Sequence, residues 1–210
     1  MKNEAASFFL VIDLEATCDE EKRIRDREME IIEIGAVLVD AESLEPLAEF
    51  QTFVKPVRHP ILTEFCTKLT TITQADVEDA PGFPEAIAYL RHFIDGEDAL
   101  FCSWGDYDRR QFEQDAGFHK VALPFGGRHL NVKKQFSTQL GEERRYGMDS
   151  ALRRVGLELQ GTHHRGIDDA RNIARLLPWA LGRPGSWGES ASRESPRRSR
   201  ARERSRDERG

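Results

Sequence analysis

The sequence contains no apolar run that approaches the roughly 20 residues needed to cross a lipid bilayer. Its first residues, Met1–Ser7, also lack the basic start and the long apolar stretch of a signal peptide. These two absences argue against a membrane protein and against a secreted one. We therefore expect a cytoplasmic protein.

Cysteine is scarce, with only Cys18, Cys66 and Cys102 in 210 residues. The three have no paired spacing that would indicate a zinc site, and no even number that would indicate a framework of disulfides. We interpret them as reduced thiols, mostly packed in the interior.

An excess of positive charge is also missing, because the formal net charge is −6. This charge argues against a broad basic face for nucleic acid, so any contact with nucleic acid should be local. Residues 183–210 differ from the rest, with nine Arg against five acidic residues and almost no apolar ones. We predict a folded domain at residues 7–182, followed by a basic Arg/Ser-rich tail at residues 183–210 that is either a disordered solubilising end or a weak RNA tether.

Apolar, β-branched runs predict three strands at Phe8–Leu14, Ile31–Val39 and Glu49–Val54, joined as a meander, and a fourth strand at Ala99–Ser103. Helical spacing and terminal glycines predict helices that begin near Thr73 and Glu85, and at Tyr107–Ala116, Asn131–Leu140, Met148–Val155 and Ile167–Leu181. Strands and helices in this arrangement indicate an α/β domain with a mixed sheet flanked by helices.

Asp13 and Glu15 lie two residues apart on the first predicted strand, so both side chains leave the same face near the strand end. Their neighbours are apolar, and two buried like charges raise each other's pKa unless a cation neutralises them. A divalent metal ion is the simplest source of that cation. The alternative is that the pair lies at a solvent-exposed strand end and binds nothing.

Further acids follow the fourth strand in Trp104-Gly105-Asp106-Tyr107-Asp108, which opens a helix. Either Asp106 or Asp108 is a candidate third ligand, since Mg²⁺ prefers hard oxygen donors. Asp106 is also in a suitable position to cap the helix.

Imidazole and carboxylate occur together in His163-His164-Arg165-Gly166-Ile167-Asp168-Asp169. Histidine suits proton abstraction because its pKa lies near neutrality, and Asp169 falls in the first turn of the last helix. The segment indicates a general base beside a metal ligand, or else two loop histidines with an acidic helix start.

Together these motifs resemble the DEDDh branch of the DnaQ-like 3′-to-5′ exonucleases: Asp13-Leu14-Glu15-Ala16-Thr17-Cys18, then Tyr107-Asp108, then His164 with four residues before Asp169. Within that superfamily the sequence is similar to the Eri-1-like group, which includes the histone mRNA 3′-end exonuclease. That similarity extends to Glu33-Ile34-Gly35-Ala36-Val37, Phe53-Val54-Lys55-Pro56, residues 65–74 and residues 164–174.

The resemblance implies an RNase H-like exonuclease fold with a five-stranded mixed β-sheet flanked by α-helices. It also implies that Asp13, Glu15, Asp108 and Asp169 hold two divalent metal ions, Mg²⁺ or Mn²⁺, and that His164 is the general base. It favours Asp108 over Asp106, because the family places an aromatic residue directly before its third acid.

By the same resemblance, Phe65 and Leu69 sandwich the terminal base with Tyr107 close by, and the backbone at Ala16 and Thr17 holds the terminal sugar hydroxyls. Stacking of this kind accepts any base. Without the resemblance, the spacing of Phe65 and Leu69 would indicate one apolar stripe of a core helix.

The expected function is metal-dependent 3′-to-5′ exoribonuclease activity that releases nucleoside 5′-monophosphates from single-stranded RNA or an RNA 3′ overhang. One alternative is a proofreading or repair exonuclease that acts on DNA with the same residues. Another is a nucleic-acid-binding adaptor without catalysis, which the complete set of acids and histidine disfavours.

Overall fold

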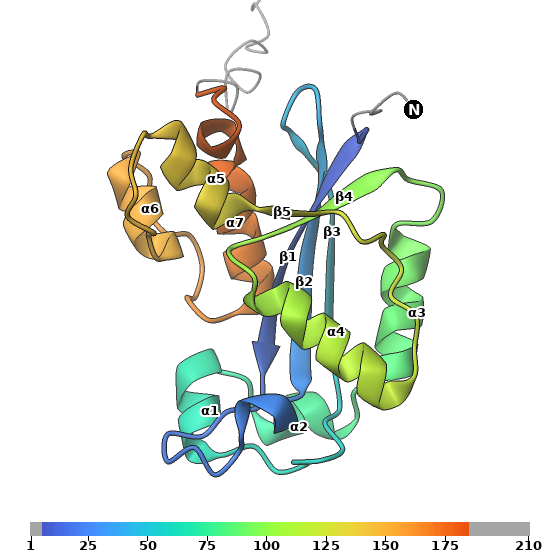
Figure 1. Cartoon of the computed structure of the whole chain (residues 1–210). Helices are drawn as coiled ribbons and strands as arrows, with labels where there is room; N and C mark the ends of the chain where they lie inside the picture. The colour runs from blue at the N-terminus through green and yellow to red at the C-terminus, as the bar shows by residue number, and fades with distance from the viewer. Residues whose placement is uncertain (1–5, 185–210) are drawn as a thin grey trace, which may run out of the picture.

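A five-stranded mixed sheet with the order β3-β2-β1-β4-β5 forms the centre of the protein (Figure 1). Strand β1 (Phe8–Ala16) pairs antiparallel with β2 (Ile31–Asp40), and β2 pairs antiparallel with β3 (Pro46–Phe53). Strand β4 (Ala99–Ser103) is parallel to β1, and β5 (His129–Asn131) is parallel to β4. The structure is a computed structural model that describes residues 6–184. It confirms both the predicted meander and the five-stranded mixed sheet.

Seven α-helices and one short 3₁₀ turn are described with this sheet. They are η1 (Asp26–Glu28), α1 (Glu64–Thr70), α2 (Gln74–Glu78), α3 (Phe83–Phe93), α4 (Tyr107–His119), α5 (Val132–Gln139), α6 (Met148–Arg154) and α7 (Gly166–Ala180). The predicted end of α4 near Gly117 was wrong. The helix runs on to His119 and stops at Lys120, whose backbone has φ 54° and whose N–H donates to the carbonyl of Ala116.

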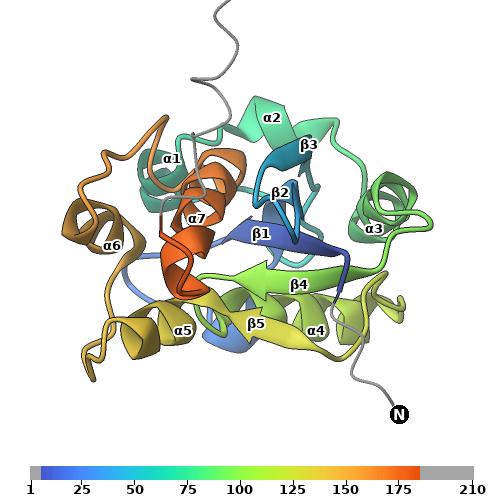
Figure 2. The ribbon, with the colours of Figure 1, turned by 90° about the horizontal axis from the view of Figure 1, so that it is seen from above.

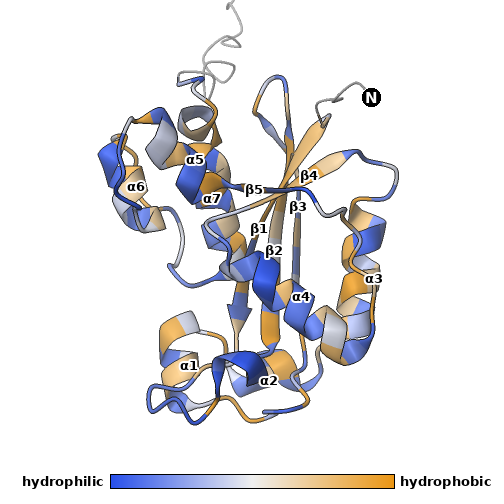
Figure 3. Ribbon diagram, viewed as in Figure 1, coloured by the Kyte–Doolittle hydropathy of each residue, from blue (hydrophilic) through white to orange (hydrophobic). Residues whose placement is uncertain are grey.

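Helices cover both faces of the sheet with separate apolar cores, and Figure 2 shows α5, α6 and α7 on one side and α3 on the other. Val11, Val37 and Cys102 pack against α5, α6 and α7. Leu10, Ile12 and the other alternate residues of β1 and β2 pack against α3 and α4. Figure 3 shows the result as hydrophobic strands beneath helices with hydrophilic outer faces.

Within residues 6–184, no helix combines the length and the apolar character needed to span a membrane. Of the predicted basic tail, only Arg183 and Pro184 belong to this range, and residues 185–210 lie outside the described residues. The guanidinium of Arg183 donates to the carbonyls of Ala41 and Glu42 in the turn between β2 and β3.

Candidate active site

Four carboxylates from three elements meet beside the end of β1. Asp13 and Glu15 leave one face of the strand, Asp108 comes from the first turn of α4, and Asp169 comes from the first turn of α7. Oxygens of Asp13, Glu15 and Asp169 lie within 4.8 Å of one another. All four residues line one cavity of about 350 Å³. Residues that are 156 positions apart in the chain therefore share a single site.

The carboxylates are crowded and largely withdrawn from water, and each has a raised pKa. Burial, followed by the charges of Asp108 and Asp169, holds the pKa of Asp13 well above its ordinary value. Burial, followed by the negative charges of Asp169 and Glu33, raises the pKa of Glu15 to about 9. Burial raises the pKa of Asp108 to about 6. The pKa of Asp169 is also raised by burial, although His163 opposes the shift.

This donor set fits divalent metal ions. A cluster of carboxylates is costly to keep ionised in a buried place, and a bound cation offsets that cost directly. The donors are oxygens, which Mg²⁺ and Mn²⁺ prefer to sulfur. Among residues 6–184, no lysine or arginine side chain lines the cavity, so none of these residues places a positive charge there to balance the four acids.

The two candidates for the third acid occupy different surroundings. Asp108 is 4% exposed, and its Oδ1 accepts a hydrogen bond of 3.1 Å from the backbone N–H of Leu14, between the two acids of β1. The side chain of Asp106 is 51% exposed and lies 4.0 Å from Arg109, outside the lining of the cavity. Asp106 occupies the N-cap position of α4, but its side chain makes no capping hydrogen bond.

Both histidines of the loop before α7 line the cavity, and their rings stack with centroids 4.0 Å apart. Nδ1 of His163 lies 3.0 Å from Oδ2 of Asp169, while the backbone N–H of His164 donates to the same oxygen. Burial and the neighbouring His163 lower the pKa of His164, which favours its neutral form. His164 has a left-handed backbone with φ 63°, a conformation that is rare outside glycine and that often marks a functional site.

Glu33 of β2 binds the start of α7, a role that the sequence did not predict. It is fully buried, and its Oε2 accepts hydrogen bonds from the backbone N–H of Gly166 and from Nε of Arg165, at 3.0 and 3.1 Å. Gln51 donates to the other oxygen. A carboxylate at this point satisfies an unpaired N–H of the first helical turn and complements the helix dipole. A single acid inside the apolar run of β2 was the sequence signal for it.

Glycine allows α7 to lie directly on the sheet. A Cβ built on Gly35 would come 2.1 Å from the carbonyl carbon of Gly166 and 2.2 Å from the nitrogen of Ile167. A Cβ on Gly166 would come 3.0 Å from the carbonyl oxygen of Asp13. The first turn of α7 therefore approaches β1 and β2 backbone to backbone, which brings Asp169 to the acids of β1.

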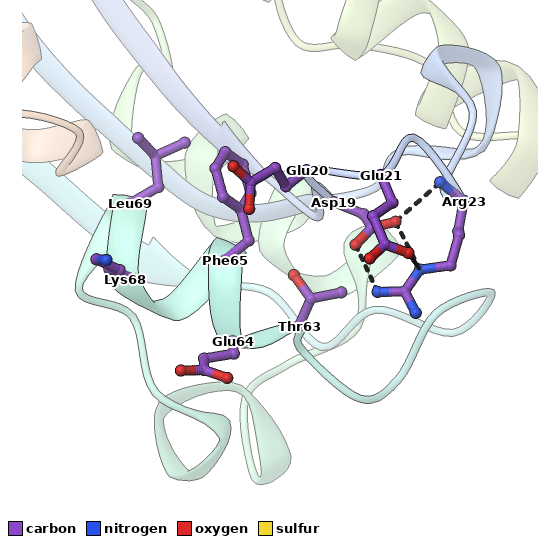
Figure 4. A pocket seen from close by; sticks show the side chains of 9 residues that line it. All are labelled: Asp19, Glu20, Glu21, Arg23, Thr63, Glu64, Phe65, Lys68 and Leu69. Atoms are coloured by element: carbon purple, nitrogen blue, oxygen red, sulfur yellow. Dashed lines mark hydrogen bonds and ion pairs between the residues drawn. The ribbon is translucent and has the colours of Figure 1, made fainter.

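The predicted substrate-binding residues divide between two neighbouring cavities. Tyr107 and Ala16 line the carboxylate cavity, whereas Phe65 lines a second cavity of about 550 Å³ next to α1. Leu69 lines both. Figure 4 shows the second cavity between α1 and the segment that follows β1. Thr17 is buried, and its N–H donates to the carbonyl of Glu30, so its part in holding a sugar stays a prediction.

Several residues that complete the carboxylate cavity were not predicted from the sequence to line a site. They are Cys18, Met29, Trp104, Gly147 and Met148. Trp104 is fixed by the hydrogen bond from its Nε1 to the carbonyl of Tyr146. This contact joins the loop after β4 to the loop before α6, which is a long-range arrangement that local sequence does not reveal.

A comparison with protein-family models finds one match, the exonuclease family represented by RNase T, over residues 10–177. Among curated proteins the chain is 32% identical to ERI1 exoribonuclease 3 of Mus musculus over 180 residues, which cover 81% of this chain and 52% of that protein. It is 29% identical to the probable 3′-5′ exonuclease KapD of Bacillus subtilis, with 80% of this chain and 82% of that protein covered. The chain spans about half the length of the ERI1 exoribonuclease 3 relatives that it matches.

Among solved structures, the nuclease domain of 3′hExo, a DEDDh family member bound to rAMP, superposes with a TM-score of 0.79 at 26% identity. The match covers 85% of this chain and 94% of that one. The same TM-score and identity hold for a 3′-exonuclease described with a histone mRNA stem-loop, with 86% of this chain and 84% of that chain covered.

Proposed function

Because the chain belongs to the RNase T exonuclease family, within its DEDDh, Eri-1-like group, we propose that it is a metal-dependent 3′-to-5′ exoribonuclease. The observation that carries this proposal is the convergence of Asp13, Glu15, Asp108 and Asp169 in one cavity with a histidine loop beside them. A binding adaptor would have no need of four mutually repelling acids with raised pKa values.

Asp13, Glu15, Asp108 and Asp169 would hold two divalent ions, Mg²⁺ or Mn²⁺. Bound ions of this kind acidify water and neutralise the charge that develops on a scissile phosphate. The hydrogen bond from Leu14 to Asp108 keeps that carboxylate directed between the two acids of β1. The contacts of Asp169 with the histidine loop hold the fourth carboxylate in the same way.

His164 is the proposed general base. Its lowered pKa leaves the ring neutral near pH 7, so that a ring nitrogen can accept a proton from the attacking water. The new P–O bond forms as the bond between phosphorus and the 3′ oxygen of the preceding nucleotide breaks. One nucleoside 5′-monophosphate leaves, and the shortened strand ends in a 3′ hydroxyl. His163 is less suited to the role because its Nδ1 already contacts Asp169.

RNA is the proposed substrate, as single strands or 3′ overhangs, because several similar curated proteins are named exoribonucleases and one similar solved structure is bound to rAMP. Leu69 and Tyr107 are 37% and 41% exposed, so their side chains are accessible to a base that stacks on them. We propose that they and Phe65 bind the terminal base, with the backbone at Ala16 and Thr17 near its sugar.

The decisive experiment uses one RNA labelled at its 5′ end and the same RNA labelled at its 3′ end, each with Mg²⁺, Mn²⁺ or EDTA. A ladder that shortens one nucleotide at a time from the 3′ end, with nucleoside 5′-monophosphate as the product, is expected only with metal. A DNA oligonucleotide of the same sequence measures the preference for RNA. Internal cuts, 5′-end shortening or unchanged activity in EDTA would contradict the proposal.

Two predictions from the sequence belong with this proposal. A chain truncated after residue 182 should keep its fold and its nuclease activity, because the exonuclease domain is placed at residues 7–182. A fluorescent fusion should be found in the cytoplasm. Loss of folding on truncation, or a fusion held at a membrane, would contradict the respective prediction.

A further inference from the structure

A groove on the outer side of α4 continues from the carboxylate cavity. Four residues of one helical stripe form its wall, at the spacing i, i+3, i+4 and i+7: Tyr107, Arg110, Gln111 and Gln114. Asp26, Arg27 and Met29, at and after η1, form the opposite wall, and the volume is about 470 Å³. Tyr107 and Met29 also line the carboxylate cavity, so the two hollows adjoin.

The wall of this groove is fixed by hydrogen bonds. The side-chain amide of Gln111 donates to the carbonyl of Met29, and that of Gln114 donates to the carbonyls of Asp26 and Met29. These bonds tie the segment around η1 to α4. The groove therefore has its shape before any ligand enters, which reduces the cost of ordering it.

Arg110 is fixed by a hydrogen bond to the backbone, and its positive charge is left to bind a ligand. Its Nε donates to the carbonyl of Asp106, one turn back on α4, at 3.2 Å. Among the described residues no carboxylate lies within 4.0 Å of its guanidinium, whereas Arg109, one residue earlier, pairs with Glu113 at 2.8 Å. Arg27 adds a second positive charge, against the one negative charge of Asp26 in the same groove. Its one ion pair among residues 6–184 is a 4.0 Å contact with Glu28. Figure 3 shows α4 as mostly hydrophilic along its length.

The cavity on the other side of the carboxylates has the opposite charge. It is lined by four acids, Asp19, Glu20, Glu21 and Glu64, and by two cations, Arg23 and Lys68 (Figure 4). Both side-chain oxygens of Asp19 accept hydrogen bonds from Arg23, which removes that cation from any ligand. A chain of phosphates would be repelled along this route and attracted along the groove of α4.

We propose that the RNA strand upstream of the scissile phosphate leaves the site over Tyr107 and runs along α4, where Arg110 binds one internucleotide phosphate. This inference rests on the proposed nuclease function and specifies the path of its substrate. Arg110 and Tyr107 lie one helical turn apart on the same stripe, so a base at Tyr107 places the next backbone segment toward the guanidinium. The acidic cavity beside α1 then receives no phosphate of the upstream strand.

The test compares Arg110→Gln with Arg109→Gln, which removes the same charge from the neighbouring residue of the same helix, outside the lining of the groove. Each variant is assayed with Mg²⁺ on an RNA octanucleotide and on the p-nitrophenyl ester of a nucleoside 5′-monophosphate, which has no upstream strand. Arg110→Gln should lower the ratio of kcat/KM on the octanucleotide to kcat/KM on the ester by roughly tenfold, mainly through KM. Arg109→Gln should leave this ratio unchanged.

Salt dependence gives a second measurement. For one lost phosphate contact on a single strand, the slope of log kcat/KM against log salt should become shallower by about 0.7, and Arg110→Lys should retain the wild-type slope. Circular dichroism checks that each variant is folded. An unchanged ratio and slope in Arg110→Gln, with active wild-type enzyme, would overturn the proposed path alone. A wild-type protein that cleaves neither substrate would refute the nuclease proposal and the path with it.

Discussion

Replacement of Gly35 by alanine should damage the active site without touching any of its acids. The added Cβ would lie 2.1 Å from the carbonyl carbon of Gly166, and ordinary contacts begin at 3.4 Å, so the two backbones must separate by about 1.3 Å (3.4 minus 2.1). Asp169 is in the first turn of α7 and moves with it. A misplacement of about 1 Å in a catalytic group costs on the order of 10²-fold in rate.

We therefore expect Gly35→Ala to lower kcat about 100-fold and to reduce stability by about 1–3 kcal/mol, the usual cost of overpacking. Single-turnover cleavage of RNA and thermal unfolding measure the two effects. Gly117→Ala is the matched control, because a Cβ there meets no atom within 4 Å and alanine is favoured over glycine in a helix, here in the last turn of α4. A Gly35→Ala enzyme with wild-type kcat and Tm would refute the argument from close packing.

Three further predictions concern the acids and the histidines. His164→Ala should lower kcat by roughly 10²–10⁴ with little change in Mg²⁺ affinity by calorimetry, and His163→Ala should cost less; a larger loss in His163→Ala would reverse the assignment. Asp108→Asn should abolish turnover at saturating Mg²⁺ while Asp106→Asn retains it, and equal kcat values in the two variants would contradict the choice of Asp108. In EDTA, the free energy of unfolding, measured by urea titration, should fall as the pH rises from about 5 to 9. The reason is that Glu15 in the folded protein has a pKa of about 9 and keeps its proton, whereas the unfolded chain releases that proton near pH 4.5. Saturating Mg²⁺ should remove most of that slope, and a slope unaffected by Mg²⁺ would argue against a metal at these carboxylates.

Much of the fold follows from patterns that are local in the sequence. The apolar runs of β1, β2 and β4 and the periodic helices α5 and α7 are long enough to be predicted within a few residues of their observed ends. Strand β5 has three residues and pairs only with β4, so its existence depends on a tertiary contact. Helix α1 has seven residues and is capped by Thr63, whose side chain accepts a hydrogen bond from the backbone N–H of Cys66. Its apolar spacing alone did not distinguish a binding site from a core.

Sequence reasoning also chose the residues that the structure brings together in the carboxylate cavity, since Asp13, Glu15, Asp108 and Asp169 all line it. Their identification drew on the order of motifs, because each pair alone had an ordinary structural explanation. The contacts that hold these four acids in place could not be predicted from the sequence. The buried Glu33 and the contact between Gly35 and Gly166 join strands and helices far apart in the chain, and their importance appears only when those elements are packed.

The position of α7 near the end of the domain has a consequence for the timing of biosynthesis. A chain that has been translated only as far as residue 160 contains three of the four acids and neither histidine of the loop. The carboxylate cavity is therefore complete only after the last helix has emerged and has docked on β1 and β2.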